Sequence, residues 1–251
     1  SASTNNITGN TIRTSATGGG SQNNFGIVLS GSSNSNVTGN TVRTSGADCC
    51  NIGIYLQSSS NSNAVTGNTV NTSATLTTNY GIILESSSSN RVIDNIVNTS
   101  GTTTNYGIYL NSASTSNVTG NTVRTSGRNS GNANNYGIIL ESSSSSNVTG
   151  NIVRTAGGVG NNNYGIYLLT SSNSNRVIDN TINTSGTTTN YGIALSSSST
   201  NNITGNTINT SGTTGNDGIS FVTATTNNGN ILDKNVIRTS GTATSHGINL
   251  K

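Results

Sequence analysis

Apolar residues recur at fixed positions along the whole chain of 251 residues, in a repeat that is 26 to 30 residues long. Each repeat has two anchors: a Gly followed by Ile, and an Asn that stands two residues before Ile or Val. The Gly anchors are Gly26, Gly53, Gly81, Gly107, Gly137, Gly165, Gly192, Gly218 and Gly247. The Asn anchors are Asn10, Asn40, Asn68, Asn95, Asn121, Asn151, Asn180, Asn206 and Asn235. A repeat that fills the chain predicts one domain over residues 1–251, either a complete protomer or a fragment of a longer solenoid.

Aligning the repeats on these anchors sorts apolar side chains into four columns. Three residues before the Asn anchor stand Ile7, Val37, Val65, Val92, Val118, Val148, Val177, Ile203 and Leu232. Two residues after it stand Ile12, Val42, Val70, Val97, Val123, Val153, Ile182, Ile208 and Ile237. The residue after the Gly anchor is always Ile, and two positions further stands Leu in eight repeats and Phe221 in the other. The alternation of apolar and polar residues within each repeat indicates β-strands that bury one face.

One repeat of this size cannot enclose a hydrophobic core by itself. Stacking the repeats about 4.8 Å apart buries like residues on like and pairs each strand with the repeats above and below it. We therefore expect an all-β fold, a single parallel β-solenoid of about nine coils of 26–30 residues.

The Asn anchors share strand parity with the buried Ile or Val that follows them, so their side chains are expected to point inward at a corner. Stacked at the coil spacing, each side-chain amide can bond to its neighbours in an asparagine ladder. The residue before the anchor is Gly in six coils and Asp94, Asp179 or Lys234 in the other three. This choice predicts a bend in which a left-handed backbone is useful.

The composition argues against several classes of protein. Asn, Ser, Thr and Gly dominate the chain, which alone would indicate disorder, but the periodicity outweighs that reading. A net charge of +3 is too dilute to predict a nucleic-acid partner. No apolar run approaches the roughly 20 residues that span a bilayer. The first residues resemble no signal peptide, so export is expected to have happened earlier, or the chain is a piece of something longer.

The repeat units resemble those of a known superfamily. The segment from Gly107 to Leu110, and the segment Asn117-Val-Thr-Gly-Asn-Thr-Val-Arg-Thr125, are similar to the repeats of pectate-lyase-like and NosD-like right-handed parallel β-helix proteins. The resemblance covers the whole chain and implies a right-handed winding. It leaves the function open, because the superfamily includes lyases, hydrolases, phage tailspikes, adhesins and surface proteins.

The acidic residues indicate no catalytic cluster. They are Asp48, Glu85, Asp94, Glu141, Asp179, Asp217 and Asp233. Glycoside-processing sites on this kind of fold require carboxylates that gather, for a metal or for acid and base chemistry. Glu85 and Glu141 share a column but lie two coils apart, about 10 Å. We therefore expect no enzyme and no catalytic residue.

Other chemical motifs have plain structural interpretations. Arg91 with Asp94, and their counterparts 85 residues later, are expected to be local charge pairs within an internal duplication of three coils. His246 is expected to stand alone in place of a Tyr, so neither a metal site nor a cofactor is predicted. The adjacent Cys49 and Cys50 are candidates for a vicinal disulfide, a bridge to another chain or reduced thiols, and the sequence does not choose among these.

Two columns next to the Gly anchor suggest surfaces. The residue before the anchor is aromatic in most coils, and a stack of rings is favoured over a platform for sugars. The residue two positions after the anchor is expected to point outward as an apolar stripe, which predicts a lateral contact with another chain. The stripe consists of Val28, Tyr55, Ile83, Tyr109, Ile139 and Tyr167.

A further outward column lies three residues after the Asn anchor. It holds Arg13, Arg43, Arg124, Arg154 and Arg238, with Asn71, Asn98, Asn183 and Asn209 in the other coils. Each of these four Asn begins an Asn-Thr-Ser sequon and is a candidate glycosylation site. Outward Thr columns also raise an ice-binding hypothesis, although the interleaved Arg and Asn would interrupt such a face.

The ends of the chain predict self-association. No capping segment is apparent, and the last residues, Ile248, Asn249 and Leu250, would continue in phase into the first coil at Asn5, Asn6 and Ile7 of another copy. The leading hypothesis is thus a secreted, extracellular or cell-surface filament subunit built by head-to-tail stacking. The alternative is a carbohydrate-binding or carbohydrate-processing module such as an adhesin, a tailspike or a lyase-like protein, with glycans as partners.

Overall fold

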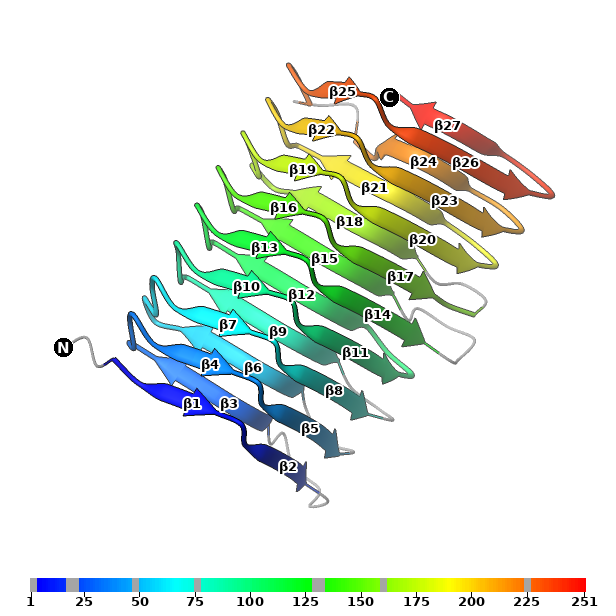
Figure 1. Ribbon diagram of the computed structural model, residues 1–251. Helices are drawn as coiled ribbons and strands as arrows, with labels where there is room; N and C mark the ends of the chain where they lie inside the picture. The colour runs from blue at the N-terminus through cyan, green and yellow to red at the C-terminus, as the bar shows by residue number, and fades with distance from the viewer. Residues whose placement is uncertain are drawn as a thin grey trace.

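We describe the protein from a computed structural model that covers residues 4–16, 23–46, 50–74, 78–127, 134–158, 162–223 and 227–251. These residues form 27 β-strands and no helix, arranged in three parallel sheets of nine strands each (Figure 1). Each coil contributes one strand to sheet A, one to sheet B and one to sheet C, and we call such a set of three strands a rung. Rung 1 is nearest the N-terminus and rung 9 nearest the C-terminus.

The strands have nearly constant lengths within each sheet. Sheet A consists of β1 (Asn6–Thr8), β4 (Asn36–Thr38), β7 (Ala64–Thr66), β10 (Arg91–Ile93), β13 (Asn117–Thr119), β16 (Asn147–Thr149), β19 (Arg176–Ile178), β22 (Asn202–Thr204) and β25 (Ile231–Asp233). Sheet B consists of β2 (Thr11–Ala16), β5 (Thr41–Gly46), β8 (Thr69–Ala74), β11 (Ile96–Gly101), β14 (Thr122–Gly127), β17 (Ile152–Ala156), β20 (Thr181–Gly186), β23 (Thr207–Gly212) and β26 (Val236–Gly241). Sheet C consists of β3 (Asn24–Ser30), β6 (Asn51–Gln57), β9 (Asn79–Glu85), β12 (Asn105–Asn111), β15 (Asn135–Glu141), β18 (Asn163–Leu169), β21 (Asn190–Ser196), β24 (Asn216–Phe221) and β27 (Ser245–Asn249).

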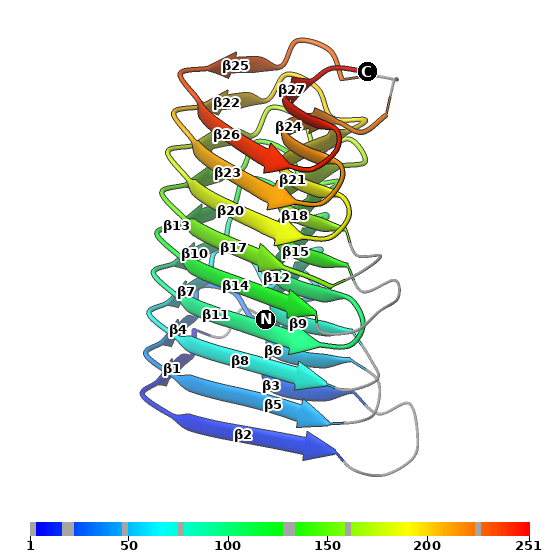
Figure 2. The ribbon, with the colours of Figure 1, turned by 90° about the vertical axis from the view of Figure 1, so that its right-hand side faces the viewer.

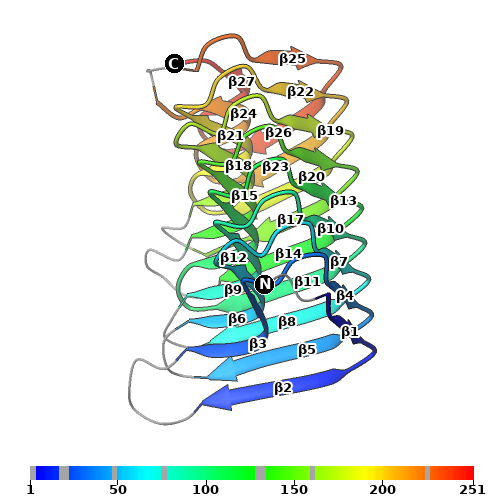
Figure 3. The same ribbon diagram turned by 90° about the vertical axis from the view of Figure 1, so that its left-hand side faces the viewer.

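The coil winds to the right. In Figure 2 the strands of sheet B lie in front and run from left to right, while the chain rises from blue to red and returns behind through sheet C. Figure 3, taken from the other side, shows the same regular stacking of the coils. The right-handed parallel β-solenoid expected from the sequence is therefore confirmed.

The four apolar columns form one continuous core. Ile27, Ile54 and Ile82 lie in register on adjacent strands of sheet C and are all buried. The columns from sheets A and B pack against them between the sheets. Because the same residue type recurs at each level, burial is shared evenly along the rod and depends on every rung having neighbours.

The asparagine ladder predicted at the Asn anchors is also confirmed. From Asn10 to Asn206, each anchor donates from its backbone N and from its side-chain Nδ2 to Oδ1 of the next anchor, over 2.9 to 3.0 Å. The bend before it is left-handed as expected, even where Gly is replaced: φ is 53° at Asp94, 54° at Asp179 and 51° at Lys234.

The turns between sheets C and A hold a further ladder that the sequence analysis missed. It consists of Ser35, Asn63, Asn90, Ser116, Ser146, Asn175, Asn201 and Asn230. The backbone N of each member donates to the side-chain oxygen of the next one. The signal in the sequence was a position restricted to Ser and Asn within the Ser-rich turns.

One sequence expectation is wrong in this part of the molecule. The Arg91–Asp94 and Arg176–Asp179 ion pairs are absent from the described residues, whose ion pairs are Lys234–Asp233 and His246–Asp217. The left-handed turn directs the Asp94 carboxylate toward Gly120 in the next rung, while Arg91 stays exposed on the outside of sheet A. The Thr found four residues after each Asn anchor shares the inward face of sheet B and is buried over rungs 2 to 8.

Candidate functional site

The outer face of sheet C carries a column of aromatic rings just before the Gly anchors. Neighbouring rings in this column stack: the centroids of Tyr80 and Tyr106 are 4.7 Å apart at an interplanar angle of 4°, and those of Tyr164 and Tyr191 are 4.9 Å apart at 16°. Between these two stacks Tyr136 meets Tyr164 edge-on. The ring stack expected from the sequence is thus present, and most ring faces in this part of the column are used by other rings.

The outward stripe from Val28 to Tyr167 lies beside this aromatic column. Val28 is 42% exposed, as expected, but Ile83 and Ile139 are only 6% and 3% exposed. In the sheet register, Ile139 lies between Tyr109 and Tyr167, whose rings also contact the aromatic column and leave little room for solvent. The expectation of an apolar stripe exposed over six coils is therefore wrong at these two positions.

A hollow interrupts the aromatic face at rung 2. The column holds Ile52 there, whereas rungs 3 to 7 all hold Tyr. The missing ring leaves a hollow of about 310 Å³, lined by the rings of Phe25, Tyr55, Tyr80 and Tyr109 together with Ile52. Glu85, Asn111 and Asn23 add polar groups to the same lining. The hollow combines aromatic walls with a few convergent polar groups, which is typical of small-ligand sites.

Two tyrosines hold the carboxylates of this face in place. The Tyr55 hydroxyl donates to Oε2 of Glu85, and the Tyr109 hydroxyl donates to Oε2 of Glu141. Burial raises the pKa of Tyr55, and the hydrogen bond to Glu85 raises it further, so the phenol stays neutral and remains a donor. The same two causes, with Glu141 as the partner, raise the pKa of Tyr109. Each carboxylate has its own tyrosine, and in the register Asn111 lies between the two carboxylates.

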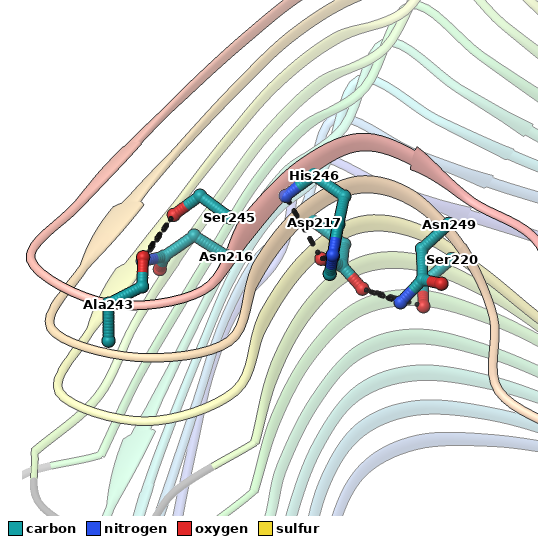
Figure 4. Close-up of polar contacts among 7 residues, drawn as sticks. All are labelled: Asn216, Asp217, Ser220, Ala243, Ser245, His246 and Asn249. Atoms are coloured by element: carbon teal, nitrogen blue, oxygen red, sulfur yellow. Dashed lines mark hydrogen bonds and ion pairs between the residues drawn. The ribbon is translucent and has the colours of Figure 1, made fainter.

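At the C-terminal end of the aromatic column a buried acid replaces the ring. Asp217 is 2% exposed, and its Oδ1 lies 2.8 Å from Nδ1 of His246, which is directly opposite on β27 (Figure 4). Asn249 Nδ2 and the Ser220 hydroxyl donate to Oδ2 over 2.8 and 3.0 Å. The expectation that His246 stands alone is therefore wrong. Both residues occupy the aromatic column, and the stacking of rungs makes them neighbours.

The environment of Asp217 is expected to make the stability of the β24–β27 pairing depend on pH. Burial alone would raise the pKa of Asp217, but the hydrogen bonds from Asn249, His246 and Ser220 outweigh it and lower the pKa below its ordinary value. A carboxyl whose pKa is lowered by folding stabilises the folded state above its unfolded-state pKa. That contribution is lost as the pH falls through the lower, folded-state pKa.

The remaining predicted site residues lie apart from this face. On the outside of sheet B, the sequon residues Asn71 and Asn98 are joined by a side-chain hydrogen bond of 3.1 Å, as are Asn183 and Asn209. Glycosylation at these four positions stays a prediction. Of the Cys pair, Cys49 lies outside the described residues and Cys50 lines the hollow at Ile52, so the disulfide also stays a prediction.

The head-to-tail residues sit at opposite ends of the rod. Asn5, Asn6 and Ile7 belong to rung 1, and Ile248, Asn249 and Leu250 to rung 9. Ile248 is 48% exposed and Leu250 is 67% exposed. The sequence predicts that Asn249 contacts another copy of the chain. Its side chain donates a hydrogen bond to Asp217 within the same chain.

The fold and its ladders define a right-handed parallel β-helix protein. The chain belongs to the family described as periplasmic copper-binding protein (NosD), whose family model matches residues 53–186, that is 134 of the 251 residues. No curated protein was found to match the chain in sequence.

Several solved structures are similar to this chain at low identity. The A-module of the mannuronan C-5 epimerase AlgE4 from Azotobacter vinelandii is 11% identical, with a TM-score of 0.38 over 99% of this chain and 90% of that one. The surface protein and adhesin PfbA of Streptococcus pneumoniae is 12% identical, with a TM-score of 0.45 over 98% and 67%. A DFA-IIIase from Arthrobacter chlorophenolicus A6 is 13% identical, with a TM-score of 0.31 over 69% and 59%. None of these likenesses is close enough to transfer a substrate or an activity.

The side chains of this protein do not fit the copper site that the family description implies. Copper in proteins is held by His, Cys and Met, and the matched segment 53–186 contains none of the three. The whole chain has one His, two Cys and no Met. Among the described residues no three His, Cys, Asp or Glu gather in one place. The described part of the chain also holds no helix long and apolar enough to cross a membrane.

Proposed function

We propose that this protein is an extracellular or cell-surface carbohydrate-binding β-helix, and that the hollow at Ile52 receives a neutral sugar ring. The observation that carries the proposal is the gap in the aromatic column, walled by rings and bordered by Glu85. Aromatic rings pack well against the apolar face of a sugar, and a carboxylate and an amide can bond to its hydroxyl groups. The volume of about 310 Å³ lies at the small end of ligand sites, which suits one or two sugar units.

The proposal assigns binding to this face and no reaction. Tyr55 donates to only one oxygen of Glu85, and a carboxylate can accept several hydrogen bonds, so Glu85 can still accept from a ligand hydroxyl. Glu85 and Glu141 are two rungs apart, about 10 Å, and each is engaged by its own tyrosine. Such a pair can position hydroxyl groups along a glycan without acting on one bond.

Filling the hollow tests this function. Ile52→Tyr places in rung 2 the residue that the column carries in rungs 3 to 7, so the new ring is expected to complete the stack. The ring contacts should raise the free energy of unfolding by about 0.5 to 1.5 kcal/mol. The same ring should lower the affinity for neutral oligosaccharides at least about tenfold, which is a loss of about 1.4 kcal/mol in binding free energy. Titration calorimetry with cello-, xylo- and malto-oligosaccharides, together with urea denaturation, measures both effects.

The chain contains a matched control for the carboxylate. Glu85→Gln removes the charge at the hollow, whereas Glu141→Gln removes the same charge beside a continuous ring column. Only the first substitution should weaken glycan binding. Equal binding by wild type, Ile52→Tyr and Glu85→Gln would show that this hollow is not the site.

A second function, self-stacking into a filament, is favoured by the matching chemistry of the first and last rungs. Both carry the same columns: Ile7 and Leu232 in sheet A, and Ile12 and Ile237 in sheet B, are only partly buried. A second copy placed so that its rung 1 covers rung 9 would bury these side chains and pair β27 with β3. The lateral contact through the stripe from Val28 to Tyr167 remains a weaker part of this proposal, because Ile83 and Ile139 are already buried.

This second function predicts rods of many copies. The 251-residue chain should sediment as concentration-dependent assemblies that appear as long rods in electron micrographs. Ile248→Lys with Leu250→Lys should shorten them by placing charges at the exposed edge of rung 9. A monodisperse monomer at high concentration would exclude stacking and leave glycan binding unaffected.

A further inference from the structure

The outer face of sheet B carries exposed arginines that lie next to one another. Arg13 pairs directly with Arg43 across β2 and β5, and Arg124 with Arg154 across β14 and β17. Arg238 occupies the same column on β26. All five side chains are exposed, and none forms an ion pair with any described residue. Like charges directly opposite each other on neighbouring strands are destabilising, so this arrangement is not explained by the stability of the sheet.

The strands of sheet B offer no compensating negative charge. None of their nine sequences contains Asp or Glu, and none contains Phe, Tyr or Trp. The outward positions on either side of the Arg column are mostly Thr and Ser. The face is therefore positive, rich in hydroxyl groups and without aromatic residues, in contrast to the aromatic and acidic face of sheet C.

The arginines follow a regular order along the rod. From rung 1 to rung 9 the column reads Arg, Arg, Asn, Asn, Arg, Arg, Asn, Asn, Arg. At a strand spacing of about 4.8 Å, an Arg pair thus recurs every four rungs, or about 19 Å. The Asn pairs between them, Asn71–Asn98 and Asn183–Asn209, are each joined by a hydrogen bond and keep further amide groups in the same line. Positive pairs separated by neutral hydrogen-bonding pairs form a linear pattern that follows the axis.

One Arg pair also borders a hollow. A depression of about 400 Å³ is lined by Arg124 and Arg154 together with Asn98, Ser100 and Ser126. Arginine binds carboxylate and sulfate groups with two parallel hydrogen bonds, while the hydroxyl and amide groups beside it suit the hydroxyl groups of a sugar. The local chemistry therefore matches a ligand that carries both kinds of group.

We propose that the outer face of sheet B binds a linear acidic polysaccharide that lies along the axis of the rod, with its acidic groups at the Arg pairs. The Asn pairs and the flanking Ser and Thr contact uncharged sugar hydroxyls between them. Nucleic acid fits less well, because proteins that bind single strands supply aromatic side chains for the bases and this face has none. This site is on a different face from the hollow at Ile52 and does not depend on it.

The test compares two double variants with the same net charge. Arg124→Gln with Arg154→Gln, and Arg91→Gln with Arg176→Gln, each lower the formal charge from +3 by two to +1. The first pair lies in the sheet B column, and the second lies outside on sheet A. All four side chains are exposed, so both proteins should keep the wild-type circular dichroism spectrum. The probes are oligogalacturonates of defined length and their methyl-esterified, uncharged counterparts.

The proposal expects a specific pattern of affinities. The sheet B variant should bind oligogalacturonate at least about tenfold more weakly than wild type, and the sheet A variant within about twofold of it. Oligomers long enough to span two Arg pairs should bind more tightly than short ones, and wild-type affinity should fall with rising salt. Asn71→Arg with Asn98→Arg, which makes the column continuous over six rungs, should increase the affinity.

Three results would overturn it. Equal losses of affinity in the two double variants would show that binding depends only on the overall charge of the protein. Methyl-esterified oligomers that bind as tightly as oligogalacturonate would show that the acidic groups are not recognised. Single-stranded DNA bound as tightly as oligogalacturonate would show that the face does not recognise a sugar. Since Ile52→Tyr leaves this face untouched, it should change none of these affinities, and that independence separates this site from the sheet C site.

Discussion

Replacing Gly107 by Ala is expected to lower the free energy of unfolding by more than about 3 kcal/mol, which is at the upper end for a single added methyl group. A Cβ at Gly107 would lie 2.2 Å from Cγ1 of Val123 in sheet B and 2.5 Å from the carbonyl oxygen of Gly137 in the next rung. The second contact is with backbone, so β12 and β15 must separate for the methyl group to fit. Urea denaturation followed by circular dichroism measures the loss.

Gly150 serves as a control that distinguishes the effect of this close contact from the effect of backbone strain alone. Gly150 has a φ of 65°, but a Cβ there would meet no atom within 4 Å. Gly150→Ala should therefore cost only the left-handed conformation, about 1 to 2 kcal/mol, and Gly150→Asn less than that. Asp94, Asp179 and Lys234 already occupy this column with similar φ values. Equal losses for Gly107→Ala and Gly150→Ala would contradict the close approach of sheets B and C.

Replacing Asn121 by Ala is expected to cost about 3 to 5 kcal/mol. Its Nδ2 donates to the carbonyl oxygens of Val92 and Thr119 and to Oδ1 of Asn151. Its Oδ1 accepts from the backbone N and the Nδ2 of Asn95. The substitution leaves at least two fully buried polar groups without a partner, and each such group costs about 1 to 3 kcal/mol.

The outward column supplies the control for the ladder. Asn98→Ala removes one hydrogen bond, to Asn71, at a half-buried position. Its expected cost is about 0.5 to 1.5 kcal/mol. Denaturation midpoints of the two variants compare them directly, and hydrogen exchange should show the added opening at Asn121 centred on rungs 4 to 6. A loss at Asn121 no larger than that at Asn98 would mean that the ladder does not stabilise the rod.

The fold was predictable because every rung repeats the same register. Ile54, Ile82 and Ile108 are all buried because they occupy the same position in successive rungs. The apolar pattern of one repeat is short, but its recurrence in nine repeats makes the prediction of the fold strong. The asparagine ladder followed from parity alone, since Asn121 lies two residues before the buried Val123. The second ladder was missed because Ser116 and Asn90 play the same part with different side chains.

The candidate site was less predictable, for three physical reasons. If side chains alternated strictly along β9, Tyr80 would point inward like Ile82. The paired positions of β9 and β12 leave out Gly81, so the alternation is interrupted there and Tyr80 lies on the outer face beside Ile83. The hollow exists because rung 2 has Ile52 at the position where rungs 3 to 7 have Tyr. An alignment of the repeats highlights residues that recur and does not draw attention to a missing ring. Contacts between columns, such as that of Tyr55 with Glu85, arise from neighbouring rungs and are not visible within one repeat.

The Asn ladders give the rod an electrical direction. At each step of the anchor ladder the lower residue donates and the upper one accepts, as from Asn95 to Asn121. The side-chain amide dipoles therefore add along the axis, as peptide dipoles do in a helix. The Oδ1 atoms of the anchors face the side of rung 1. One Nδ2 hydrogen of each anchor faces the side of rung 9, while Nδ2 also donates to a carbonyl oxygen of the rung below, as from Asn121 to Val92. A coil that continues the anchor ladder on the rung 9 side must bring a side-chain acceptor at that position, so two such sides cannot continue the ladder with each other.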